Sequence, residues 1–189
     1  MAFSFTAAIF AQQDTALIKR LNELISATHA MDFGKILDYT YPKVFTIVPK
    51  AQLLEAIKSS LHTDGISLQF DSLKIDSLYP VFTLSGGRYA KIASSMKMRM
   101  KIKFPPEDST AESKKEYTEV IEMTMESQFG AENVHTDGTG YISIRMEASM
   151  VAVKDEYARE WCFVTLKEKD PLVHRLFGKE MIDKLATYK

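Results

Sequence analysis

The amino-acid sequence predicts an α+β fold, a curved antiparallel sheet with N-terminal helices packed on its concave face, plus a C-terminal helix. Three observations predict it. Apolar residues recur at helical spacing from residue 14 to 61, alternate with polar residues from 66 to 104, and return to helical spacing after residue 170. No repeat or linker divides the chain, so residues 12–189 are expected to form a single domain.

Three helices are predicted before the sheet. Asp14 caps the first, whose leucines and isoleucines gather on one face. The second ends before Pro42, because proline disfavours helical geometry in the residue that precedes it. Pro49 opens the third, while Val44–Val48 is a compact run of β-forming residues. The predicted helical ranges are 14–30, 33–39 and 49–63.

The sheet begins where the apolar period changes to two, at Ile66. The alternation changes phase beyond Ser72, and a one-residue slip would expose the buried face, so a bulge is expected near Asp71-Ser72. The longest strand spans about Tyr89–Phe104, with isoleucines and methionines on one face and lysines and Arg99 on the other. Further strands are predicted at 142–152 and 160–166.

Two more helices are predicted. Ser109 and Glu112 form a capping box for a helix that runs to Phe129 and ends at Gly130, although the same stretch also suits a strand. The C-terminal helix starts at Asp170-Pro171.

The composition argues against several classes of function. Lys plus Arg number 24 against 25 for Asp plus Glu, whereas a nucleic-acid-binding protein would show a basic excess. A single cysteine, Cys162, excludes an internal disulfide and a cysteine-based zinc cluster. The four histidines are scattered, and no glycine-rich phosphate loop is present, so no metal and no cofactor are expected. No apolar run reaches the roughly 20 residues of a membrane span.

The N-terminus is uncharged and apolar from Met1 to Ala11, and Gln12-Gln13-Asp14 follows abruptly. We interpret residues 1–11 as the remnant of a truncated signal peptide, which predicts a periplasmic or extracellular protein. In the alternative, the four large apolar residues of this segment form an ordinary first strand or helix turn and the protein is cytoplasmic.

The layout and three stretches resemble the nuclear transport factor 2-like superfamily (the SnoaL-like, cystatin-like cone), and more narrowly its uncharacterised exported bacterial members. The stretches are MDFGKILDYTYPKVF, EASMVAVKDE and EWCFV, and the resemblance covers about Asp14 to Leu166. It implies a cone with helices over a concave sheet, and homodimerisation through the sheet. Since the superfamily includes isomerases, dehydratases, ligand binders and protein-binding modules, it implies no particular chemistry. The segment 109–129 and the C-terminal helix depart from the pattern.

One candidate site lies at the junction of helix and strand. If Asp38, Tyr39 and Tyr41 point into the cone, Asp38 can act as a base while a tyrosine hydroxyl stabilises an oxyanion. Alternatively, Asp38 is solvated at the end of a helix and the tyrosines pack over the junction.

A second candidate site is an apolar ligand cavity on the methionine-bearing strand face. A wall of methionines reshapes readily around apolar molecules. Chelation of one soft metal ion by the same side chains is disfavoured, because same-face residues along a strand are about 6.6 Å apart. The opposite, basic face either contacts an acidic partner or is simply solvated. The expected ligand-lining residues are Tyr41, Ser94, Met96, Met98, Met146 and Trp161.

These observations favour a non-enzymatic binding module, which holds a small apolar ligand in the cone or binds protein through the sheet. The alternative is a small-molecule isomerase or dehydratase that uses Asp38 with Tyr39 or Tyr41.

Overall fold

A computed structural model describes residues 14–61, 66–104, 110–137, 141–167 and 170–188. The predicted signal-peptide remnant therefore lies outside the described residues. The elements, in chain order, are α1 (Thr15–His29), α2 (Phe33–Asp38), η1 (Pro42–Thr46), α3 (Lys50–Leu61), β1 (Ile66–Leu78), β2 (Phe82–Leu84), β3 (Gly87–Ile102), α4 (Ala111–Phe129), η3 (Ala131–Asn133), β4 (Val134–Thr136), β5 (Tyr141–Lys154), β6 (Cys162–Leu166), α5 (Pro171–Leu176) and α6 (Lys179–Ala186).

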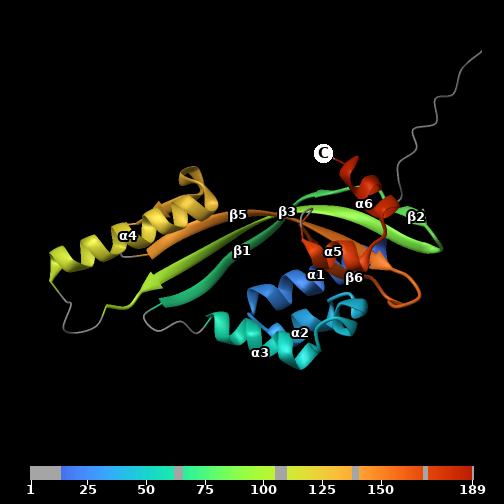
Figure 1. The fold of residues 1–189 in the computed structure, drawn as a ribbon, viewed down its shortest axis with the longest axis horizontal. Coiled ribbons are helices and arrows are strands. Elements are labelled where there is room, and N and C mark those ends of the chain that lie inside the picture. Colours follow the sequence, from blue (N-terminus) through green and yellow to red (C-terminus); the bar gives the residue numbers. More distant parts are fainter. Residues whose placement is uncertain (1–13, 62–65, 105–109, 138–140, 168–169, 189) are drawn as a thin grey trace, which may run out of the picture.

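The strands form one long antiparallel sheet, which confirms the predicted α+β fold class (Figure 1). Its order is β1-β3-β5-β4, with β2 beside β3 and β6 beside β5. The ladder between β3 and β5 runs from Arg88 to Lys101 without a register shift. Beside β5, β6 pairs with the part that ends at Val153 and β4 with the part near Ile144. We call the β6 end of the sheet the proximal half and the β4 end the distal half.

The bulge predicted near Asp71 is confirmed, because the register of β1 against β3 shifts between Phe70 and Ser72. A second shift, which the alternation did not predict, lies between Ile75 and Ser77. Together the two shifts keep the apolar residues of β1 on one sheet face despite the change of phase.

Three cores stabilise the fold. The α1 core packs α1 on one face of the proximal half, and the C-terminal core packs η1, α5 and α6 on the opposite face. The distal core packs α4 on the distal half. Buried members of the α1 core include Leu17, Leu21, Ala90, Ile92, Ala152, Trp161 and Phe163. Those of the C-terminal core include Tyr41, Val44, Tyr89, Val151, Val153, Val173, Leu176 and Met181. Those of the distal core are Met100, Ile102, Val134, Ile142 and Ile144, with Ile121, Met125 and Phe129 of α4 packed against them.

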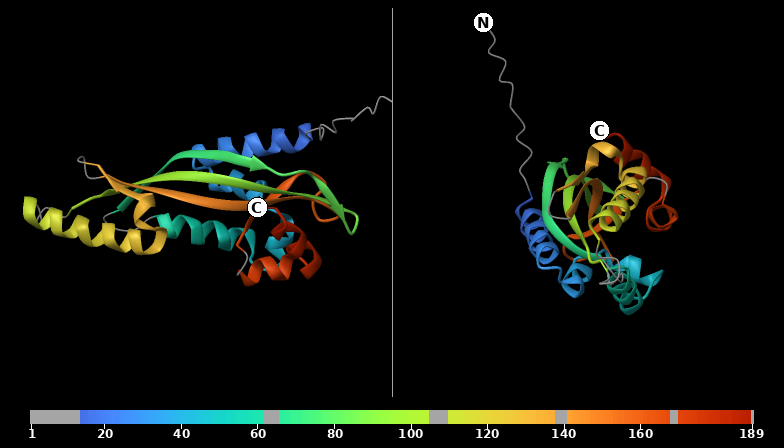
Figure 2. Two further views of the ribbon diagram at one scale, coloured as in Figure 1. Left: turned by 90° about the horizontal axis from the view of Figure 1, so that it is seen from above. Right: turned by 90° about the vertical axis from the view of Figure 1, so that its left-hand side faces the viewer.

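The α1 core and the distal core share one sheet face, since Ile92 and Ile102 are an even number of residues apart in an unshifted ladder. Nevertheless α1 and α4 lie on opposite sides of the molecule (Figures 1 and 2). The right-handed twist of the long strands accounts for this, because it turns the shared face around as the strands run from one half to the other.

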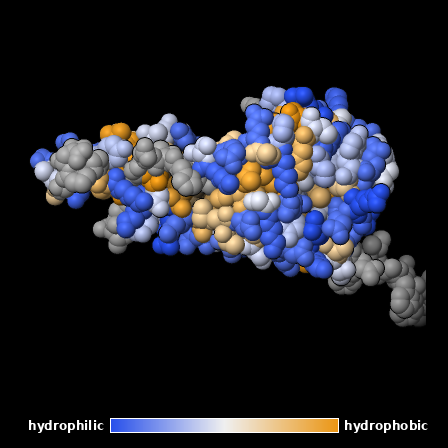
Figure 3. Space-filling model, turned by 90° about the horizontal axis from the view of Figure 1, so that it is seen from below, coloured by the Kyte–Doolittle hydropathy of each residue, from blue (hydrophilic) through white to orange (hydrophobic). Residues whose placement is uncertain are grey.

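Between these two cores the shared face carries apolar side chains that are only half-buried, among them Leu73 and its cross-strand neighbour Met96. Figure 3 shows hydrophobic surface in the middle of the molecule, on the side where α1 to α3 lie. In the described part of the chain, no helix combines the length and the apolar character that crossing a membrane requires.

Three local predictions need correction or refinement. The run Val44–Val48 is not a strand, because Pro42 starts a 3-10 helix that buries Val44. The C-terminal helix is interrupted, since Phe177 and Gly178 are extended and Gly178 is the N-cap of α6. The helix α4 is confirmed, and so is its end at Gly130, which has a positive φ of 89°. Its N-cap is Thr110; the predicted cap, residue 109, lies outside the described residues.

Candidate functional site

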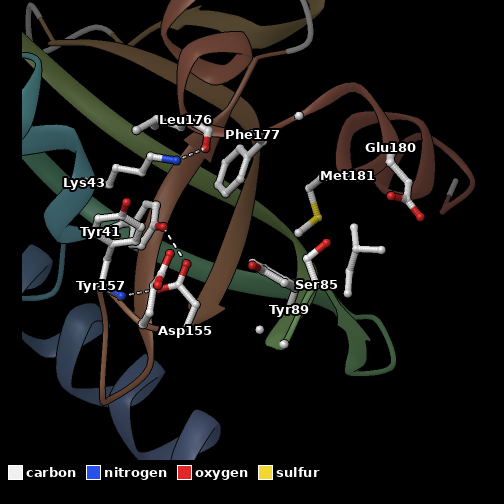
Figure 4. A pocket seen from close by; sticks show the side chains of 15 residues that line it. Tyr41, Lys43, Ser85, Tyr89, Asp155, Tyr157, Leu176, Phe177, Glu180 and Met181 are labelled. Carbon is white, nitrogen blue, oxygen red and sulfur yellow. Dashed lines mark hydrogen bonds between the residues drawn. The ribbon is translucent and has the colours of Figure 1, made fainter.

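A pocket of about 470 Å³ opens on the sheet face opposite α1, where the C-terminal helices meet the strand ends (Figure 4). The turn between β2 and β3, the loop between β5 and β6, and the α5–α6 junction surround it. Its walls carry both rings and charges. They include Tyr41, Lys43, Leu84, Ser85, Gly87, Tyr89, Asp155, Glu156, Tyr157, Phe177, Glu180 and Met181.

Tyr41 reaches the pocket because the chain before Pro42 runs beside β6. The Tyr41 N–H donates to the Phe163 carbonyl at 2.9 Å, and the Phe163 N–H donates to the Tyr39 carbonyl at 2.8 Å. Thr40 thereby forms a parallel bridge with Phe163. Side chains alternate along such an extended segment. Tyr39 therefore lies in the α1 core and Tyr41 in the C-terminal core.

The Tyr41 hydroxyl donates a hydrogen bond of 2.6 Å to Asp155 Oδ2. Burial, followed by the hydrogen bond to Asp155, raises the pKa of Tyr41 well above its usual range. The hydroxyl consequently stays protonated near neutral pH. Asp155 Oδ1 accepts the N–H groups of Tyr157 and Ala158 at 2.9 and 3.1 Å, which shapes the loop between β5 and β6. The carboxylate thus has three donors from the protein itself.

Aromatic rings form much of the wall. Tyr41 and Phe177 stack with centroids 6.0 Å apart and ring planes 5° apart, and Tyr157 meets Tyr41 edge-on at 6.4 Å. The Tyr89 ring lies over the backbone of Gly87, where any Cβ would collide with the Tyr89 hydroxyl. A glycine at this position therefore gives Tyr89 its place in the pocket.

Lys43 forms a hydrogen bond inside the pocket. Lys43 Nζ donates to the Leu176 carbonyl at 2.9 Å and lies 5.3 Å from the centroid of the Tyr157 ring. Its ammonium thereby satisfies an unpaired carbonyl in the last turn of α5. Figure 4 shows Lys43 directed across the pocket toward this carbonyl.

The predicted catalytic group is dispersed. The Asp38 side chain is 63% exposed at the end of α2 and forms an ion pair with Lys50. It does not line the pocket. Tyr39 is buried beneath the Arg20 guanidinium, which lies 4.5 Å from its ring centroid. Tyr41 has a carboxylate partner, but that partner is Asp155.

The predicted ligand-lining residues are dispersed as well, and of the six only Tyr41 lines this pocket. Trp161 is buried in the α1 core. The Ser94 hydroxyl donates to the Ala148 carbonyl at 3.2 Å. Met98 and Met146 pack against the distal core, and Met96 is half-buried between the cores.

Sequence reasoning missed Asp155, Tyr89, Tyr157 and Phe177 as site residues. A usable signal was present for one of them, because an aspartate directly after a strand often accepts a hydrogen bond from the backbone N–H two residues on and so stabilises a turn. The other three come together only through tertiary contacts.

Metal and thiol chemistry receive no support from the geometry. Within the described residues, no three His, Cys, Asp or Glu side chains are grouped so that they could hold a metal ion. Cys162 is buried, and this burial raises the pKa of its thiol, which disfavours the nucleophilic thiolate.

No protein-family model, no curated protein and no solved structure matches this chain.

Proposed function

We propose that the protein is a non-enzymatic binding module that holds a small ligand in the pocket between the β5–β6 loop and the C-terminal helices. The observation that carries the proposal is the wall of this pocket, in which aromatic rings surround polar groups that already bond to one another. Sites that bind small molecules combine apolar walls with a few placed polar groups.

The occupied hydrogen bonds favour binding over catalysis. A general base needs a free lone pair within reach of the substrate proton. Asp155 accepts from Tyr41 and from two backbone N–H groups, which occupy three of the roughly four lone-pair sites of a carboxylate, so its main role is to order the loop. Asp38, the base of the isomerase or dehydratase alternative, is exposed and ion-paired away from the pocket.

The other expectations remain predictions. Membership of the nuclear transport factor 2-like superfamily, homodimerisation through the sheet and a periplasmic or extracellular location follow from the resemblance and the leader-like N-terminus. Binding of a protein through the sheet is the second form of the proposed binding function. The basic distal face suits it, since Lys97 and Lys101 are exposed there.

A matched pair of tyrosine variants tests the proposal. Tyr157 at the pocket and Tyr117 on α4 are 50% and 52% exposed, so replacing either with alanine should leave the fold intact. Compounds found by a thermal-shift screen of the wild-type protein should bind Tyr157→Ala at least tenfold more weakly and Tyr117→Ala unchanged.

Two outcomes contradict the proposal. Compounds that keep their affinity for Tyr157→Ala, as measured by titration calorimetry, bind elsewhere on the molecule. Chemical conversion of a bound compound by the wild-type protein, followed by mass spectrometry, would show that the module is an enzyme.

A further inference from the structure

The charges around the pocket are unbalanced. Its lining includes the carboxylates Asp155, Glu156 and Glu180 but one cationic side chain, Lys43. Among the described residues, neither Glu156 nor Glu180 forms an ion pair, whereas Lys43 is already engaged by the Leu176 carbonyl. The site therefore offers negative charge to a ligand.

This negative charge reaches the inner wall. Tyr89 lies at the base of the β2–β3 turn, and its pKa is raised by burial and then by the carboxylates of Asp155 and Glu156. The same carboxylates that act on the Tyr89 hydroxyl act on anything that occupies the space beside it. An anionic ligand would be repelled from this space, while a cationic one would be attracted.

The rings add a second feature that suits a cation. The face of an aromatic ring attracts a cation that lies within about 6 Å of its centroid. Tyr157 already receives a cation in this way, since the Lys43 ammonium lies 5.3 Å from its centroid. Tyr41, Tyr89 and Phe177 line the same pocket, so a ligand enters among further rings.

From charge and rings together we infer that the ligand is an organic ammonium compound with an apolar body. The ammonium group is held between the ring faces and the carboxylates of Glu156 and Glu180. The apolar body contacts Leu84 and Met181, which line the same pocket. Met181 lies on the α6 side of the pocket, beside Glu180 (Figure 4). A volume of about 470 Å³ accommodates both parts. This inference rests on the proposed binding function and adds the chemical class of the ligand.

Three probes of nearly the same shape isolate the effect of the ligand's charge on its affinity. Choline carries a trimethylammonium group, 3,3-dimethylbutan-1-ol replaces its nitrogen with carbon, and 3,3-dimethylbutanoate is an anion on the same frame. Titration calorimetry of the full chain should show that choline binds at least tenfold more tightly than the alcohol, and that the carboxylate binds more weakly still.

Two glutamate variants test whether choline binds in this pocket. Glu180 lies in the first turn of α6, and Glu112 occupies the equivalent place in α4, remote from the pocket. Glu180→Gln should weaken choline about two- to fivefold and leave the alcohol unchanged, because it removes an exposed charge and keeps the shape. Glu112→Gln should change neither affinity.

The outcomes distinguish this inference from the function on which it rests. If the alcohol or the carboxylate binds as tightly as choline and Tyr157→Ala weakens it, the pocket binds ligands but the ammonium inference is wrong. If choline binds Tyr157→Ala as well as wild type, the proposed site itself is wrong. The inference is also overturned if choline does not bind at 10 mM while the thermal-shift screen finds neutral or anionic compounds that do bind.

Discussion

The two halves of the sheet use the same strands in different ways. In the proximal half, helices cover both faces, and Tyr89, Ala90 and Ile92 of β3 are all buried. In the distal half, α4 covers one face, so the exposed Lys101 separates the buried Met100 from the buried Ile102. The comparison shows that strict alternation along a strand marks a sheet covered on one side. The pocket lies in the half that is covered on both.

The largest expected difference between the halves concerns aromatic side chains. Trp161 is 1% exposed in the α1 core, and Phe104 is half-buried at the distal end. Trp161→Ala should lower the free energy of unfolding by about 3–5 kcal/mol, since it leaves a cavity between packed layers. Phe104→Ala should cost roughly 1–2 kcal/mol. Urea unfolding followed by circular dichroism measures both, and equal losses would contradict the comparison.

A loss of unfolding free energy of intermediate size is expected when the charge of Asp14, at the start of α1, is removed. The Asp14 carboxylate accepts the Leu17 N–H at 3.0 Å and pairs with Arg88 of β3 at 2.8 Å. Burial alone would raise the pKa of Asp14, but the Leu17 N–H, the Trp161 side chain and the charge of Arg88 together more than offset it, so the pKa lies below its usual value of 3.8.

Because the folded pKa is lowered, the charge of Asp14 stabilises the protein above pH 3.8, and this stabilisation is lost as the pH falls through the folded pKa. Asp14→Asn keeps the cap and removes the charge, so it should cost about 1 kcal/mol at pH 7 and nothing in strong acid. Unfolding curves between pH 2 and 7 measure this. A difference that stays constant over that range would refute a stabilising role for the charge of Asp14.

The smallest expected difference in the free energy of unfolding is between substitutions of two lysines on one face of β3. Lys91 Nζ donates to the Tyr188 carbonyl at 2.5 Å in the proximal half, whereas Lys101 is exposed in the distal half. Lys91→Met should cost about 1 kcal/mol and Lys101→Met less than about 0.5 kcal/mol. The midpoints of urea unfolding test both variants, provided that the slope of the unfolding free energy against urea concentration is unchanged. A larger loss of stability in Lys101→Met than in Lys91→Met would contradict the expected difference between the halves.

The sequence predicted the features that depend on local period. The phase change in β1 indicated the bulge beyond Phe70, because a buried sheet face does not tolerate a slip. Gly130 indicated the end of α4, since its positive φ favours glycine. The interruption at Gly178 was not predicted, because the apolar residues on both sides of it keep a helical spacing.

The site escaped prediction because it depends on long-range contacts. Tyr41 and Asp155 are 114 residues apart and meet because β6 pairs with β5 and with the segment before Pro42. The same pairing separates Tyr39 from Tyr41, which are close in sequence. Periodicity carries no information about either event.

The bridge between Thr40 and Phe163 has a thermodynamic consequence. One short backbone segment supplies Tyr39 to the layer beneath α1 and Tyr41 to the pocket on the opposite side. The two surfaces therefore share one backbone segment, and we expect a change in the conformation of that segment to alter both of them. We therefore expect a ligand that fixes Tyr41 to raise the free energy of opening the α1 layer. By reciprocity, a substitution that loosens α1 lowers the affinity of the pocket without touching it.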